Sequence, residues 1–169
     1  MKNTGKNLEN WILAEAGKYE RKGKLILRKV DPPSFTRLIK GRAIHTLLSN
    51  PFPDFIGCTK RGTTVCIEAK STKEKRLAFG KSGIRQKQID DLNAFRKFGA
   101  ICGIIWDCGK FYWVTLDDIK KAESDGRKSI TPDYCSEIKS ENGHVIDFFT
   151  NLSHNMDFSE WQEGGSSRF

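Results

Sequence analysis

Two stretches of the chain carry apolar residues at the spacing of an α-helix. In residues 7–21 they stand at positions 8, 11, 12, 16 and 19, and in residues 84–98 at positions 89, 92, 95 and 98. Each set falls on one side of a helix, with polar residues on the other side. Asn7 is the expected N-cap of the first helix, and Gly99 is expected to end the second. Residues 117–123 predict a third, shorter helix.

Five further segments are short, apolar and rich in residues that favour strands. They are residues 24–30, 54–58, 64–70, 100–106 and 110–115. Polar turns at residues 60–62 and 107–109 would fold the last four segments into two hairpins. The pattern therefore predicts strands alternating with helices along the chain.

The other segments show neither the helical spacing nor the strand pattern. Residues 34–53 mix bases with scattered apolar residues and end in Pro-Phe-Pro, and residues 71–83 are polar, basic and contain glycine, which predicts a loop. Residues 145–152 predict one more strand or helix, and residues 153–169 predict a mobile tail. No linker divides residues 1–152, so we expect one domain.

Charge is distributed unevenly along the chain. There are 29 Lys and Arg against 21 Asp and Glu, which gives a net charge of +8. Residues 18–43 and residues 58–98 each carry a surplus of +7, whereas residues 99–169 carry −5. A basic half joined to an acidic half is typical of proteins that bind a polyanion such as nucleic acid, although a solvated surface has the same composition.

The five cysteines and the short apolar runs indicate in which cellular compartment the protein is found. An odd number of cysteines without a C-x-x-C pair favours free thiols in a reducing cytoplasm over disulfides or a zinc site. No run is long enough to cross a bilayer, and the first residues show no apolar signal-peptide region. We therefore expect a cytoplasmic protein with no membrane partner.

The residues that indicate chemistry are Pro53-Asp54 and, after a hairpin turn, Glu68-Ala69-Lys70. Alternate side chains of a strand share a face, so Glu68 and Lys70 should point the same way while the hairpin brings Asp54 beside them. Two carboxylates suit Mg²⁺, which polarises a phosphate and activates water, and a neighbouring lysine stabilises charge in the transition state. The pattern predicts a metal-dependent nuclease.

The same spacing also occurs in strands whose polar residues simply face water. Two observations count against this alternative. The residues around Glu68, from Val65 to Ala69, are otherwise apolar, and the motif lies within the basic half of the chain.

The pattern P-D…E-A-K resembles the PD-(D/E)XK nuclease superfamily, and the chain more narrowly resembles the RecU family of Holliday junction resolvases. The resemblance covers most of residues 5–152 and rests on several ordered anchors. They are Gly5…Leu8-Glu9, Asp54…Gly57, Ile67–Lys70, Gln88-Ile89, Gly103–Ile105 and Gly126–Ile130. It implies an α/β fold with a restriction-endonuclease-like core, a mixed β-sheet flanked by helices, and a protruding stalk within residues 32–53.

The resemblance implies roles at matching positions only. Asp54 and Glu68 would bind the metal ion, Mg²⁺ with Mn²⁺ as a substitute, and Lys70 would be the catalytic lysine. Glu9 matches an acid of the first helix and would complete the carboxylate cluster, directly or through water, or would instead pair with the helix dipole. Gln88 matches a glutamine near the site, or else faces solvent on the polar side of its helix.

The resemblance also implies contacts with DNA. The stalk would enter the open centre of a four-way junction, where its bases would meet phosphates of several arms. The expected phosphate contacts are Lys29, Arg37, Lys40, Arg42, Lys73, Lys75, Arg76, Lys81, Arg85 and Lys87. A stalk shorter than usual, the lack of a long basic extension before the first helix, and Lys87 where the family has histidine are departures that fit a compact phage version.

The expected activity is Mg²⁺-dependent cutting of four-way DNA junctions in recombination and repair, in a bacterial cell or in the host of a phage. Water would attack the phosphorus in line and leave a 5′-phosphate. Paired cuts in opposed strands need two active sites, which predicts a two-fold homodimer. A recombinase or a branch-migration helicase would be a further partner. Some apolar residues would serve the dimer or pack within the monomer: Ile39, Ile44, Leu47, Leu48 and Phe52.

Two other functions stay open at this point. One is a different nuclease of the superfamily, restriction-like or branch-trimming, which would cut linear duplex as well as junctions. The other is a recombination accessory protein that binds DNA without catalysis, against which the intact Asp54, Glu68 and Lys70 argue.

Overall fold

The computed structural model describes residues 4–47, 52–138, 140–141 and 145–146. Six strands form one mixed sheet, in which β5 and β7 are parallel and the other neighbours antiparallel. In their order across the sheet they are β1 (Leu25–Lys29), β4 (Phe55–Thr59), β5 (Thr64–Ser71), β7 (Ile101–Asp107), β8 (Phe111–Thr115) and β10 (Ser136–Glu137). The predicted strands are thus confirmed to within a residue or two, and β10 is an addition.

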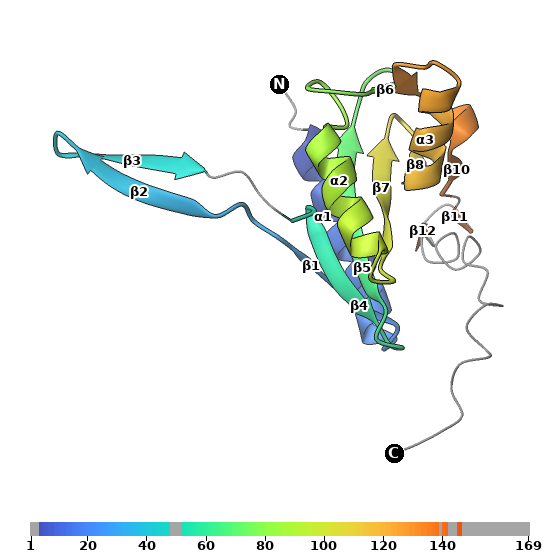
Figure 1. Ribbon diagram of the computed structural model, residues 1–169. Helices are drawn as coiled ribbons and strands as arrows, with labels where there is room; N and C mark the ends of the chain where they lie inside the picture. The colour runs from blue at the N-terminus through green and yellow to red at the C-terminus, as the bar shows by residue number, and fades with distance from the viewer. Residues whose placement is uncertain (1–3, 48–51, 139, 142–144, 147–169) are drawn as a thin grey trace.

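Three α-helices of the described residues flank this sheet: α1 (Thr4–Arg21), α2 (Gln86–Arg96) and α3 (Leu116–Ser124) (Figure 1). α1 packs Leu8 and Ile12 with Phe55 on one face of the sheet, and α2 and α3 pack Leu92 and Ile119 on the other face. Burying these side chains drives the assembly of the layers. The mixed sheet flanked by helices, implied by the resemblance, is confirmed.

The first helix begins earlier than predicted. It starts at Thr4, so Asn7 lies inside α1 and the expected cap at Asn7 is wrong. Polar residues ahead of Leu8 continue the helix because Leu8 is already anchored against the sheet. No helix in the described part of the chain is both long enough and apolar enough to span a membrane.

Short elements account for the other differences from prediction. The segment 71–83, expected to be a loop, contains β6 (Leu77–Ala78), which pairs with β9 (Ser129–Ile130). A 3₁₀ turn, η1, and a small hairpin, β11 with β12, follow later in the chain. Their bounds are Pro132–Tyr134, Ser140–Glu141 and Val145–Ile146. The rest of the predicted element 145–152, and the tail 153–169, lie outside the described residues.

A separate antiparallel hairpin, β2 (Ser34–Ile39) with β3 (Arg42–Leu47), projects away from the sheet and is here called the stalk (Figure 1). Lys40 and Gly41 form its two-residue turn, with φ angles of 51° and 75°. Positive φ at both positions is the geometry of a type I′ turn, which suits the twist of a hairpin. The expected protrusion is confirmed, and residues 34–47, which follow no period in the sequence, form a two-stranded ribbon.

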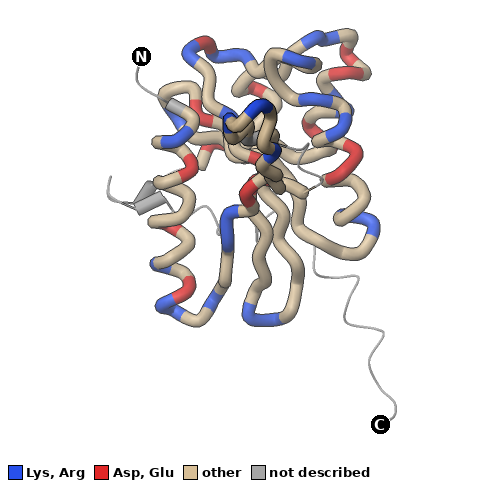
Figure 2. The backbone as a smooth tube through the Cα atoms, turned by 90° about the vertical axis from the view of Figure 1, so that its left-hand side faces the viewer, with Lys and Arg blue, Asp and Glu red and all other residues tan. Residues whose placement is uncertain are grey.

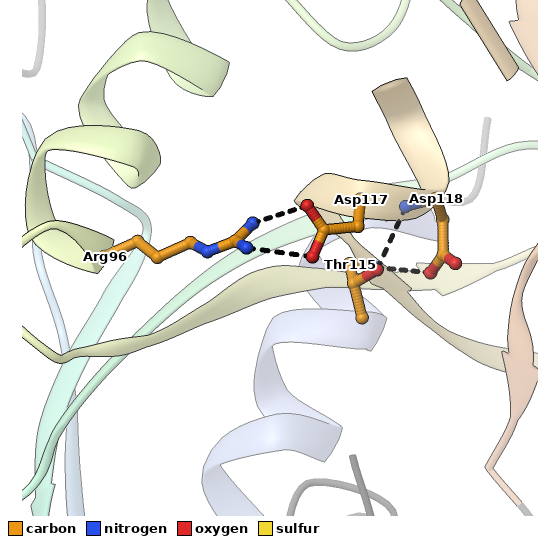
Figure 3. Close-up of polar contacts among 4 residues, drawn as sticks. All are labelled: Arg96, Thr115, Asp117 and Asp118. Atoms are coloured by element: carbon orange, nitrogen blue, oxygen red, sulfur yellow. Dashed lines mark hydrogen bonds and ion pairs between the residues drawn. The ribbon is translucent and has the colours of Figure 1, made fainter. Parts of the chain in front are cut away.

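An ion pair ties α2 to α3. Both terminal nitrogens of Arg96 donate to the carboxylate of Asp117, at 2.8 and 2.9 Å (Figure 3). Thr115 is the N-cap of α3: its hydroxyl accepts from the N–H of Asp118 at 3.1 Å, and the Asp118 carboxylate accepts from the N–H of Thr115 at 2.8 Å. This capping box fixes the start of α3 and, through Asp117, the end of α2.

Gly57 allows β1 and β4 to pair closely. A Cβ at this position would collide with the carbonyl oxygen of Ile26 and lie 2.9 Å from Cα of Leu27. We expect Gly57→Ala to lower the free energy of unfolding by about 1–3 kcal/mol, because the strands must move apart. Urea unfolding followed by circular dichroism measures the change.

The control is Gly17→Ala in α1, where the added Cβ would meet only the Arg21 side chain, at 3.6 Å. This change should raise the free energy of unfolding by about 0.5–1 kcal/mol, because alanine favours a helix over glycine. Equal stability of the Gly57→Ala variant and the unchanged protein would contradict the pairing of β1 with β4.

Candidate active site

The register of β4 and β5 places Asp54 opposite Glu68. Phe55 pairs with Ile67 in this antiparallel register. Asp54, which precedes Phe55, therefore lies opposite Glu68, which follows Ile67. Oδ2 of Asp54 accepts a hydrogen bond from the N–H of Ala69 at 3.0 Å, and the Asp54 carbonyl accepts from the N–H of Val30 at 2.8 Å. Asp54 is therefore fixed from the strands on both sides of it.

Glu68 is a buried carboxylate with only 3 % of its surface exposed. Nε2 of Gln88 donates a short hydrogen bond to its Oε2, and Nζ of Lys70 lies 3.7 Å from the same oxygen. Burial, reinforced by the charge of Asp54 and opposed by Lys70, raises the pKa of Glu68 to about 8. The predicted convergence of Asp54, Glu68 and Lys70 at one place is present in the structure.

Gln88 connects α2 to the carboxylate. Its Oε1 accepts the N–H of Arg85, the N-cap residue of α2, at 3.2 Å, while its Nε2 is turned to Glu68. Of the two positions considered for Gln88, solvent-facing or near the site, the structure has the second.

A pocket opens beside these residues. It is lined by Phe52, Asp54, Glu68, Arg85, Lys87, Gln88 and Asp91. The sequence did not single out Phe52 or Asp91 as site residues. The signal for Asp91 was its spacing of four residues from Lys87, which places both on one side of a helix.

The donor set fits a divalent cation. Two carboxylates face one another, and the charge of one hinders ionisation of the other, a conflict that a cation between them would relieve. Among the described residues no three Asp, Glu, His or Cys side chains are grouped to hold an ion. Mg²⁺ suits such a sparse set, because it keeps several waters and takes phosphate oxygens of the substrate as ligands.

Glu9 is engaged elsewhere. Its Oε2 lies 3.0 Å from Nζ of Lys29, which is also 3.4 Å from Asp31, and the hydrogen bond with Glu9 raises the pKa of Lys29. Because α1 begins at Thr4, Glu9 is not in its first turn, and the expected pairing with the helix dipole is wrong. Its role as a metal ligand stays a prediction.

The bases expected to contact DNA lie in three places. The first is the stalk, which points toward the viewer in Figure 2, where Lys and Arg positions are blue. Arg37 and Arg42 share one face of this ribbon, because Arg37 pairs with Ile44 and Arg42 with Ile39. The Arg37 guanidinium lies 5.3 Å from the centre of the Phe35 ring on the same face.

The second place is the loop between β5 and α2, where Lys73, Lys75 and Lys81 are exposed and Arg76 pairs with Glu74 at 2.8 Å. The third is the pocket, lined by Arg85 and Lys87. Lys40 stands at the tip of the stalk, and Lys29 at its base is paired as described above.

Packing within the monomer leaves three of the apolar residues expected to serve a dimer partly exposed. Ile39, Ile44 and Phe52 are each about half exposed, although the Phe52 ring lies 6.4 Å from that of Phe95. Leu48 lies outside the described residues.

Comparison with known proteins shows a family match and a likeness to solved structures. A family model described as RecU, recombination protein U, matches residues 3–154. A solved structure of Hjc from Archaeoglobus fulgidus, described as a Holliday junction resolvase from an archaeal hyperthermophile, is similar over 79 % of this chain and 96 % of that chain. The TM-score is 0.52 and the identity 18 %, so this likeness shows the fold. No protein with a curated function matches the chain.

The raised pKa of Glu68 predicts how stability depends on pH in the metal-free protein. The pKa of this carboxyl group rises from an ordinary value of 4.5 to about 8 in the folded state. Folding therefore favours the protonated form. The free energy of unfolding should therefore fall as pH rises from about 4.5 to 8 and then level off. Each unit by which the pKa is raised contributes about 1.4 kcal/mol to this fall.

Glu68→Gln should lack this fall, because the amide does not ionise. Urea unfolding in EDTA between pH 5 and 9 measures the difference, with Glu74→Gln at an exposed position as the control. The same pH dependence in wild type and Glu68→Gln would show that Glu68 titrates normally.

Proposed function

The chain belongs to the RecU family, and we propose that it is a Mg²⁺-dependent endonuclease that cuts four-way DNA junctions. The observation that carries this proposal is the pairing of Asp54 with the buried Glu68, next to Lys70, in a pocket that also holds bases. We propose that residues 1–152 make up the nuclease domain.

Asp54 and Glu68 would hold the metal ion. When bound, Mg²⁺, or Mn²⁺ in its place, would polarise the phosphodiester and lower the pKa of a water. The N–H of Ala69 and the amide of Gln88 orient the two carboxylates. Lys70 would stabilise the negative charge that develops on the phosphate oxygens in the transition state.

The stalk would supply the preference for a branched substrate. Its bases stand on a ribbon that projects from the sheet, where they can reach the centre of a junction while the pocket meets one arm. Paired cuts in opposed strands require a two-fold dimer. The exposed Ile39, Ile44 and Phe52 are apolar surface for such a contact.

Three single variants test the active site. Asp54→Asn, Glu68→Gln and Lys70→Ala should each abolish cutting of a labelled four-way junction in Mg²⁺ and leave junction binding largely unchanged. Phosphate contacts dominate affinity, whereas these three residues act on the metal and on transition-state charge. Gel analysis of products, with binding measured in parallel, separates the two effects.

Arg61→Ala, at the exposed turn after β4, is the control and should cut normally. Cutting at the wild-type rate by any of the three site variants would refute its assignment. A wild-type protein that binds junctions but never cuts them would favour a non-catalytic accessory role.

The stalk predicts a second result. Replacing Arg37, Lys40 and Arg42 together by alanine should reduce the preference for the junction over linear duplex roughly a hundredfold, at about 1 kcal/mol for each phosphate contact. Cutting should remain, because the stalk contributes no residue to the pocket. Competition between the two DNAs at fixed salt measures the preference.

The matched control replaces Lys73, Lys75 and Lys81 of the loop before α2. These bases should meet any duplex, so their loss should weaken both affinities by a similar factor. If the stalk variant also lost both affinities equally, the stalk would be a general DNA contact. Equal cutting of junction and linear duplex by wild type would favour a restriction-like nuclease.

A further inference from the structure

The pocket contains a third carboxylate, that of Asp91, which the proposed reaction does not use. Asp91 lies in α2 one turn after Lys87, and both line the pocket together with Asp54 and Glu68. Its Oδ2 is 2.6 Å from Nζ of Lys87. The Asp91 carboxylate is thus engaged by a cation of its own helix.

The charges at the start of α2 are the reverse of the usual pattern. The N-cap is Arg85, Lys87 is the second helical residue, and the first turn contains no acid. In α3, by contrast, the first turn carries Asp117 and Asp118. Cations are unfavourable at the positive end of a helix dipole. Such a departure from the preferred charge pattern is expected where function requires it. Here the function would be the binding of an anion by these bases.

Helix stability does not account for the Lys87–Asp91 pair. A pair with lysine before the acid has the less favourable order on a helix, and exposed pairs of this kind contribute little to stability. Lys87 is about half exposed, while the Asp91 side chain is 27 % exposed. The Lys87 ammonium is therefore accessible to a ligand, while it is held by the less exposed Asp91 carboxylate.

We propose that Asp91 is a positioning residue that holds the Lys87 ammonium at the wall of the pocket, where Lys87 binds a phosphate next to the one that is cut. This inference rests on the proposed function. An ammonium has three N–H donors, so one can meet Asp91 while the others meet phosphate oxygens. Ordering the flexible lysine in advance reduces the entropy lost when DNA binds.

A second pair on the same helix offers a matched control. Nε2 of Gln86 donates to Oδ1 of Asp90 at 2.9 Å, with the same spacing of four residues, but neither residue lines the pocket. Asp90→Asn and Asp91→Asn remove the same charge from neighbouring positions. If only long-range charge mattered, both changes would tighten DNA binding. The positioning role predicts the opposite sign for Asp91.

The experiment measures binding of a fluorescent four-way junction in EDTA and cutting of the same junction in Mg²⁺. Asp91→Asn should weaken binding and raise KM about fivefold, with kcat within about twofold of wild type. Asp91→Glu should recover most of the loss, and Asp90→Asn should show no loss. Lys87→Ala should weaken binding as much as Asp91→Asn, and the double variant no more than Lys87→Ala alone, because Asp91 acts through Lys87.

Several results would overturn the inference. They are binding by Asp91→Asn as tight as wild type or tighter, additive losses in the double variant, or a fall in kcat with unchanged KM, which would place Asp91 at the reacting phosphate. A wild-type protein that binds without cutting would refute only the proposed function, because the binding comparison does not depend on cutting.

Discussion

The carboxylate of Glu68 is buried between β5 and α2. The arrangement of the residues around the pocket follows from the need to stabilise this buried group. A charged carboxylate is costly to bury unless it is hydrogen-bonded and paired. Gln88 supplies the hydrogen bond from α2, Lys70 supplies the charge from the same strand, and Asp54 opposes both through its own charge. Together, burial and the charge of Asp54 outweigh Lys70 and make the ionised form of Glu68 unfavourable.

That arrangement requires α2 to keep its place over the sheet. Leu92 anchors the middle of the helix in the core, and the Arg96–Asp117 pair fixes its end to the capped start of α3. The contact between Gln88 and Glu68 is thus supported by residues far from the pocket. On the other side, the pairing of β4 with β5 sets the position of Asp54, whose carboxylate accepts a hydrogen bond from the N–H of Ala69. Two independent parts of the fold therefore meet at the pocket.

The elements predictable from the sequence are those with buried faces. α2 buries one side, so its apolar residues recur at helical spacing, whereas β5 is buried on both faces and is revealed by a short apolar run. The stalk exposes both faces, with Leu38 78 % exposed, so its strands leave no alternation to read. β6 and β9 have two residues each, too few for any period.

The site was predictable as far as local geometry determines it. Strand alternation and one hairpin suffice to bring Asp54, Glu68 and Lys70 together. Placing Glu9 requires knowing how α1 crosses the sheet, and the sequence cannot show that Lys29 is its neighbour. Asp91 was visible as a neighbour of Lys87 on a helix, but only the packing of α2 places this face at the pocket.

The two-residue turn of the stalk also constrains how its length can change in evolution. Arg37 and Arg42 lie on one face because the strands pair residue for residue up to Lys40 and Gly41. One residue added to each strand near the base would rotate every later side chain to the opposite face. Two residues added to each strand would keep the arginines on their face and lengthen the ribbon by about 7 Å. Relatives that retain this face should therefore differ in stalk length by even numbers of residues per strand.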